Sequence, residues 1–198
     1  MKQNTIKTFR LAVLGVSIAG LVGCASGPDV SYVDSKKVET VNVDFGSTDL
    51  QSIAEAMTRS LLQAKAITGS KEAPLITVAE VKNKTAEYID TRMITSKIET
   101  QLLKSGQVQF AVRARDMKGQ NEEIARQNDS GMYNQETIAK RGNMRGAKYR
   151  IEGEIGSIVK TNNNVKDVFY QFTLRLINNE TGTYEWADEK EIRKQQKR

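Results

Sequence analysis

An alternation of apolar and polar residues near the C-terminal end constrains the fold of this chain most strongly. Within residues 147–160 the side chains of Tyr149, Ile151 and Ile155 alternate with polar ones, and residues 168–176 repeat the pattern. A period of two places the apolar side chains on one face of a β-strand. Two such strands in succession predict an antiparallel pair that packs one face against a core.

A turn and a returning strand follow this pattern. Residues 178–182, "NNETG", hold asparagines and a glycine, which favour turns. Tyr184 and Trp186 then resume the alternation. We interpret 168–186 as a hairpin in which Trp186 is a core residue, with a platform for stacking on glycan as the alternative.

The helical signal is strongest over residues 49–67. One helical stripe carries five apolar residues, namely Leu50, Ile53, Met57, Leu61 and Ala64. Thr48 and Gln51 have the spacing of a capping box, and Gly69 supplies a stop. We expect this stripe to pack on the sheet.

The middle of the chain is predicted to form a strand, a helix and a second strand. Residues 75–85 are β-branched and apolar, residues 108–112 form a second short apolar run, and a helical pattern capped by Asp90 and ended by Gly106 lies between them. This order predicts a crossover that joins two parallel strands. The polar stretch 113–146 carries only weak helical signals, near 116–127 and 135–142. The predicted fold class is α/β, with a single mixed sheet of four to five strands sandwiched by helices on both faces.

The N-terminal residues have the pattern of an export signal. Three bases precede a short apolar run that ends in "LVGC", residues 21–24, which resembles a bacterial lipobox. Cys24 is the single cysteine of the chain, so we expect it to carry a lipid anchor. The alternatives are an ordinary signal peptide with a chance cysteine and a core cysteine of a cytosolic protein.

This interpretation divides the chain into four parts. We predict a lipoprotein signal peptide at 1–23, a lipidated cysteine and short tether at 24–42, a folded domain at 43–193 and a frayed tail at 194–198. Residue 25 is alanine and not the aspartate that retains lipoproteins in the inner membrane of enteric-type bacteria. The expected location is therefore the outer membrane, with the domain facing the periplasm.

Composition argues against several classes of function. Loss of the leader removes three bases and no acids, which lowers the formal charge from +6 to +3, too little for the basic face of a nucleic-acid binder. The chain has no histidine, which excludes Ser-His-Asp catalysis and His-ligated zinc. We predict a binding protein without cofactor or metal; an envelope enzyme that works without histidine is the less supported alternative.

Two surfaces are candidates for contact with a partner. One is a basic run across residues 140–150, comprising Lys140, Arg141, Arg145, Lys148 and Arg150. The other is the polar strand face of Arg150, Glu152 and Glu154. The partner-binding prediction combines Lys148, Arg150, Glu152 and Glu154. The alternatives are solvated bases at a helix end, and a strand face that a helix covers through the aliphatic stems.

Several segments in order resemble the LpoB family, over about residues 41–193. These segments are the lipobox, "VNVDFGSTDLQSIAEAMTRSLL", "PLITVAEVKNKT", "IETQLLKSGQVQF", "RGAKYRIEGEI" and "LRLINNETGTYEWADEKEIRK". The resemblance implies an outer-membrane lipoprotein that activates bifunctional class A penicillin-binding proteins, the peptidoglycan synthases. It also implies a domain like the amino-terminal domain of TolB.

The resemblance further implies that the chain is no enzyme but a regulator of cell wall biogenesis and cell shape, acting by contact with its synthase. The expected state is a monomer held at the membrane by acyl chains such as palmitate. One feature differs from the enteric members, which carry a long proline-rich linker where residues 25–42 are short. An envelope assembly or secretion-accessory lipoprotein with a TolB-like domain is therefore the alternative function.

Overall fold

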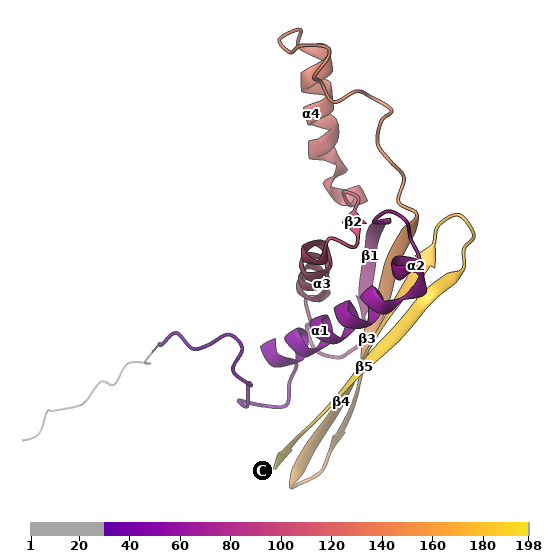
Figure 1. The fold of residues 1–198 in the computed structure, drawn as a ribbon. Helices are drawn as coiled ribbons and strands as arrows, with labels where there is room; N and C mark the ends of the chain where they lie inside the picture. The colour runs from indigo at the N-terminus through magenta and orange to yellow at the C-terminus, as the bar shows by residue number, and fades with distance from the viewer. Residues whose placement is uncertain (1–29, 198) are drawn as a thin grey trace, which may run out of the picture. The chain divides into compact units, whose positions relative to one another are not determined.

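A five-stranded mixed sheet organises the protein, of which the computed structural model describes residues 30–197 (Figure 1). The residues from Ser35 onward form one unit. The elements are, in chain order, α1 Ser47–Gln63, α2 Lys65–Thr68, β1 Leu75–Asn83, α3 Thr91–Ser105, β2 Gln109–Phe110, the 3-10 turn η1 Ala114–Asp116, α4 Met117–Asp129, β3 Tyr149–Thr161, β4 Val165–Asn178 and β5 Tyr184–Lys197.

The strand order is β2-β1-β3-β4-β5. β1 lies parallel to both β2 and β3, which confirms the predicted crossover, and β3, β4 and β5 are successively antiparallel, which confirms the hairpin. β2 has two residues and pairs only with Leu75 and Ile76 of β1. The remaining outer edge of β1 therefore has no strand beside it among the described residues.

The core lies on one face of the sheet. Tyr149, Ile151 and Ile155 are buried there, as their alternation predicts. α1 and α3 cover this face with the predicted stripe of α1 turned inward, and Ile53 and Leu61 are completely buried. Burial of a side chain of this size stabilises the fold by about 1.5–3 kcal/mol.

The mixed sheet confirms the fold class, but the expected helices on both faces are wrong for the described residues. α1, α2 and α3 contact the sheet from the same side, and α4 extends past its end (Figure 1). The opposite face carries charged side chains on β3 and β4, among them Glu152 and Arg175. A second layer of helices would bury these charges, and the face has too little apolar surface for its burial to offset that cost.

The helix ends follow local hydrogen bonding. Asp90 caps α3 by accepting the Arg92 N–H at 3.0 Å, and Gly106 ends that helix with φ of 69°, as predicted. The start of α1 differs from the prediction, because Asp49 accepts the Gly46 N–H at 2.9 Å. The Thr48 hydroxyl accepts the Glu39 N–H instead of forming a capping box with Gln51.

The polar stretch before β3 contains one of its two predicted helices. α4 confirms the signal near 116–127. The signal near 135–142 gives turns instead, because the Asn134 side chain accepts the Glu136 N–H at 3.0 Å and holds a local turn. Asparagine side chains compete in this way with helical hydrogen bonding.

Both ends of the folded unit differ from the predicted boundaries. Residues 194–197, expected to fray, lie in β5, where Lys194 is opposite Val168 and Lys197 is opposite Val165. At the other end Ser35 already accepts a hydrogen bond from the Gln51 side chain. The residues from 35 to 42 thus belong to the folded unit and shorten the tether. Cys24 and the leader lie outside the described residues.

Candidate functional site

The uncovered face of the sheet holds three of the four residues predicted to bind a partner. Arg150, Glu152 and Glu154 stand at alternate positions of β3 on the side away from the helices. The Arg150 guanidinium donates to Asn179 Oδ1 at 3.1 Å and lies 3.5 Å from Glu152 Oε2. The side chains of Arg150 and Glu152 keep 38% and 34% of their surface exposed, so both remain accessible to a partner.

β4 extends this polar face. Arg175 is opposite Glu152, and Thr173 is opposite Glu154. The Arg175 guanidinium lies 5.9 Å from the centre of the Tyr184 ring, a cation–π contact with β5. The result is a surface of both charge signs, which we call the open sheet face: Arg150, Glu152, Glu154, Thr173 and Arg175.

Lys148 does not join this surface. Its ammonium group lies 5.1 Å from the centre of the Tyr149 ring, and that ring is buried on the helical side. The rest of the basic run is also dispersed. Arg141 pairs with Asp129 at the end of α4 at 2.6 Å, and Arg145 donates to Gln109 of β2. The predicted basic run is therefore not a single patch.

A cleft of about 650 Å³ lies at the C-terminal part of β1, beside the start of α3 and residues 113–115. Its charged groups are largely paired. Asp90 accepts from the Arg92 guanidinium, whose hydrogen bond lowers the pKa of the carboxyl group. Arg113 pairs with Glu99. A carboxylate held in its charged form is suited to recognition and is a poor proton donor at neutral pH.

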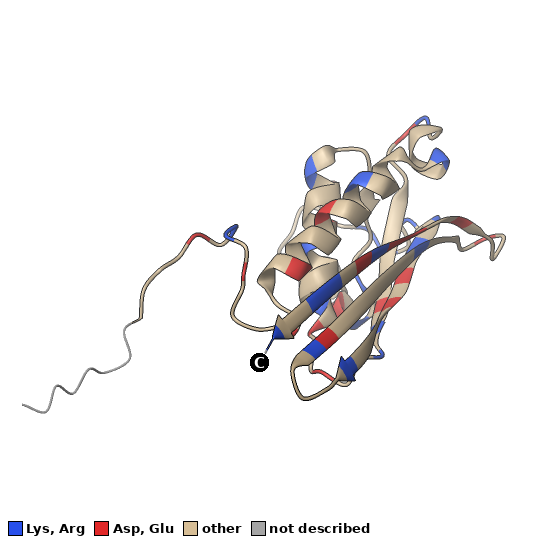
Figure 2. Cartoon of the chain, turned by 90° about the horizontal axis from the view of Figure 1, so that it is seen from below, with Lys and Arg blue, Asp and Glu red and all other residues tan. Residues whose placement is uncertain are grey.

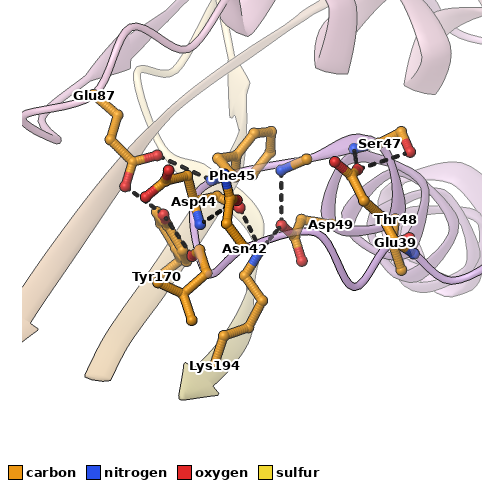
Figure 3. Close-up of polar contacts among 12 residues, drawn as sticks. Glu39, Asn42, Asp44, Phe45, Ser47, Thr48, Asp49, Glu87, Tyr170 and Lys194 are labelled. Carbon is orange, nitrogen blue, oxygen red and sulfur yellow. Dashed lines mark hydrogen bonds and ion pairs between the residues drawn. The ribbon is translucent and has the colours of Figure 1, made fainter. Parts of the chain in front are cut away.

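A second polar cluster joins the two ends of the folded unit (Figure 3). We call it the N-terminal clasp and define it by the segment Val43–Gly46 with Asp49, Glu87, Tyr170 and Lys194. The Lys194 ammonium group donates to Asp49 Oδ2 at 2.6 Å and to the Asp44 carbonyl oxygen. The Asp49 side chain is 6% exposed, so Lys194 balances a carboxylate that water hardly reaches.

The other half of the clasp is built around Tyr170 and Glu87. The Tyr170 hydroxyl donates to Glu87 Oε1 and lies 3.4 Å from the Val43 carbonyl oxygen, and Glu87 Oε2 accepts the Phe45 N–H at 2.9 Å. Burial raises the pKa of Tyr170 well above its usual value, and the neighbouring Glu87 adds to the effect. The phenol therefore stays protonated and remains a donor.

The sequence prediction missed the clasp. Lys194 lies on the inner face of β5, the same face as Ile192 and Trp186. Extension of the strand pattern beyond residue 193 would have placed it there. The partners lie far apart in the chain, however, since Asp49 and Lys194 are 145 residues apart. No local pattern connects them.

Two further properties of residues 30–197 bear on function. None of the helices described there is long and apolar enough to cross a membrane. In the same range no group of three or more acidic, cysteine or histidine side chains is placed to hold a metal ion.

A family model described as the peptidoglycan-synthase activator LpoB matches residues 49–192, from α1 to β5. The chain belongs to the LpoB family. Among curated protein sequences none matches it. The likeness to the amino-terminal domain of TolB stays a prediction.

Solved structures similar to this LpoB family member have low sequence identity to it. The LpoB C-terminal domain from Salmonella enterica is 17% identical over 73% of this chain and 98% of that chain, with a TM-score of 0.43. Escherichia coli LpoB is 16% identical over 87% and 85%, with a TM-score of 0.42. The lipoprotein GNA1162 from Neisseria meningitidis is 16% identical over 62% and 83%, with a TM-score of 0.41.

The clasp of this LpoB family member makes a testable contribution to stability. Lys194→Met leaves the Asp49 carboxylate without its cation, and we expect the free energy of unfolding to fall by about 1–3 kcal/mol. Urea unfolding measures this change. Lys104→Met, at an exposed position of α3, is the matched control and should change stability by less than about 0.5 kcal/mol.

A second substitution separates lost charge balance from lost packing. Adding Asp49→Asn to Lys194→Met removes the unbalanced charge and should recover part of the loss. Equal stability of the Lys194→Met and Lys104→Met chains would show that the Lys194 bonds of the clasp do not stabilise the fold.

Proposed function

We propose that this chain is an outer-membrane lipoprotein that binds and stimulates a bifunctional class A penicillin-binding protein, and so regulates peptidoglycan synthesis. The observation that carries this proposal is the family match over residues 49–192, which spans the folded unit from α1 to β5. The lipobox-like segment that ends at Cys24 adds independent support from the sequence.

Activation by contact needs no catalytic group on the activator. A partner that binds the active conformation of a synthase more tightly than the inactive one shifts the population toward the active form. The size of the shift is limited by the difference between the two affinities. What the activator must supply is a rigid surface of suitable chemistry.

The open sheet face is the surface that we assign to the synthase. It is built on two long paired strands, so its side chains are held at fixed spacings. Arg150 and Glu152 keep about a third of their side-chain surface exposed and are oriented by their mutual contact and by Asn179. Paired charges of this kind give a partner both orientation and selectivity.

Charge reversal on this face tests the assignment. We expect Arg150→Glu to weaken binding of the full chain to its class A synthase at least tenfold, because a favourable charge contact becomes repulsive. Lys104→Glu makes the same change of charge on α3, on the other side of the sheet, and should leave the affinity unchanged within about twofold. Interferometry against immobilised synthase measures both.

The possible results separate the surface from the function. Equal affinity of both variants would show that the open sheet face is not the binding surface, while the synthase would still be the partner. Absence of binding by the unsubstituted chain to every class A synthase of its source would reject the proposed function.

The membrane anchor is the second part of the proposal. Because the folded unit begins at Ser35, only ten residues, 25–34, lie between it and Cys24, which makes eleven Cα-to-Cα steps. Fully extended, they reach about 36–40 Å. An anchor of this length keeps the domain close to its membrane, so a synthase must bring its docking surface to within that range.

The anchor is tested by the mass of the mature chain. We expect chain recovered from membranes to begin at residue 24 and to carry acyl groups on Cys24, because a leader followed by a lipobox is processed in this way. Cys24→Ser removes the acceptor thiol and should leave the chain unacylated. An intact leader with an unmodified Cys24 would contradict the proposed location.

The short tether also favours a second candidate, an accessory lipoprotein of an envelope assembly or secretion apparatus. Such a partner would lie in the same membrane as the anchor and so within reach of a short tether, whereas a synthase in the inner membrane would lie across the periplasm. Recovery of an assembly component after cross-linking in cells, with no synthase, would decide for this alternative.

A further inference from the structure

The first residues of the folded unit, 35–42, form neither helix nor strand and contact the start of α1. We call this segment the strap. All of its residues are exposed, and even its two valines, Val38 and Val41, are 64% and 83% exposed. Figure 2 shows the strap as a single ribbon that leads to α1 near the C-terminal end of β5. Burial of apolar surface therefore contributes little to holding it in place.

Hydrogen bonds to the start of α1 hold the strap. The Glu39 carboxylate accepts the Ser47 N–H at 2.8 Å and the Ser47 hydroxyl at 3.1 Å, and the Glu39 N–H donates to the Thr48 hydroxyl at 2.8 Å (Figure 3). The Gln51 side chain donates to the Ser35 carbonyl oxygen at 2.6 Å. Three of these four bonds involve Glu39. Its carboxylate is well placed at a helix N-terminus, where backbone N–H groups lack partners within the helix.

The chain at Gly46 is fitted to this carboxylate. A Cβ atom at residue 46 would occupy the space that Glu39 Oε2 fills. The φ of Gly46 is −134°, a value that any residue adopts, so the need for glycine comes from the carboxylate and not from the backbone. Glu39 is thus the side chain that pins the strap to α1.

From Val43 onward the N-terminal clasp holds the chain in a different way. Val43 is 3% exposed and belongs to the core, and the Phe45 ring packs edge-on against Tyr170 with 5.8 Å between the ring centres. The Asp44 carbonyl oxygen accepts from Lys194. The contacts therefore change at residue 43 from exposed polar bonds to burial.

We propose that the strap is a releasable part of the tether, pinned to α1 by Glu39, and that its release lengthens the tether without unfolding the domain. Ordering one residue costs free energy comparable to the net gain from one exposed hydrogen bond, and the strap orders eight residues. A segment held in this way opens at far lower cost than the core, whose burial it does not share.

Release increases the reach of the tether by more than half. In the pinned form, the residues between Cys24 and the folded unit extend to about 36–40 Å. In the released form the domain begins at Val43, nineteen Cα-to-Cα steps from Cys24, and the full extension becomes about 63–68 Å. The gain in reach rests on the proposed anchor at Cys24, whereas the release itself does not depend on it.

The strap thereby couples reach to binding. A partner beyond the range of the pinned tether is met only by the released form, so binding to it draws population from the pinned form. Its apparent affinity is reduced by the fraction of chains that are pinned. A partner within the shorter range binds both forms. The stability of the strap therefore regulates which partners the domain reaches at full affinity.

Trypsin cleavage after Lys36 and Lys37 reports release, because cleavage follows the population of the open segment. We expect Glu39→Ala to raise the cleavage rate at these sites in the full chain at least fivefold, measured by mass spectrometry. Glu55→Ala is the matched control, since Glu55 is an exposed glutamate of α1 that pairs with Arg59. This control should change the rate by less than twofold.

Gly46→Ala is a second test that keeps Glu39. The added methyl group takes the space of the carboxylate, so we expect the same increase in cleavage after Lys36 and Lys37. Gly119→Ala is its control, because a Cβ atom at this position of α4 has no atom within 4 Å among the described residues outside the helix's own backbone. The control should leave the rate unchanged.

Amide hydrogen exchange of β4 in the same variants separates release of the strap from unfolding of the domain. The proposal predicts that β4 keeps its protection while the strap is cut faster. Equal cleavage rates of Glu39→Ala and Glu55→Ala reject it, and so does faster cleavage that occurs only with loss of protection in β4. Neither result bears on the proposed synthase partner, because both measurements use the purified chain alone.

Discussion

The alternation of side chains along β3 and β4 determines most of this structure. Ile151 and Ile155 of β3 face the same way as Phe172 and Leu174 of β4, and all four are buried against the helices. Because the alternate positions are polar, the same strands cannot bury their second face. One pattern therefore places α1 and α3 on one side and leaves a charged surface on the other. That surface is the one that we propose for contact with the synthase.

The clasp adds a second constraint, at the place where the N-terminal segment enters the sheet. Lys194 of the last strand holds Asp49 and the Asp44 carbonyl oxygen, and Tyr170 and Glu87 hold the segment from the other side. The segment Val43–Gly46, which lies inside the folded unit that begins at Ser35, is thereby fixed to β4 and β5.

The local features of the fold could be predicted from the sequence. Alternation gave the strands, the spacing of Leu50 and Ile53 gave the first helix, and Asp90 and Gly106 marked both ends of α3. Each of these signals depends on residues that are close in the chain. The predicted family, which rests on several such segments in order, agrees with the match over residues 49–192.

The remaining errors concern contacts between distant residues. The sequence predicts a frayed tail at Lys194, because no local pattern reveals its partner Asp49 at the other end of the domain, and pairing with Val168 keeps it in the sheet. Position in the chain groups Lys148 with Arg150, whereas its ammonium group lies over the buried ring of Tyr149. The local periodicity of the sequence predicts neither of these contacts. The single helical layer likewise depends on the charge of a whole sheet face, to which several strands contribute.

The most direct test of the account is the rate of glycan polymerisation by a purified class A penicillin-binding protein from the source of this chain, measured with and without the full chain. The account predicts a rate that rises with added chain until the synthase is saturated. An unchanged rate at concentrations where the two proteins are bound to each other would contradict it.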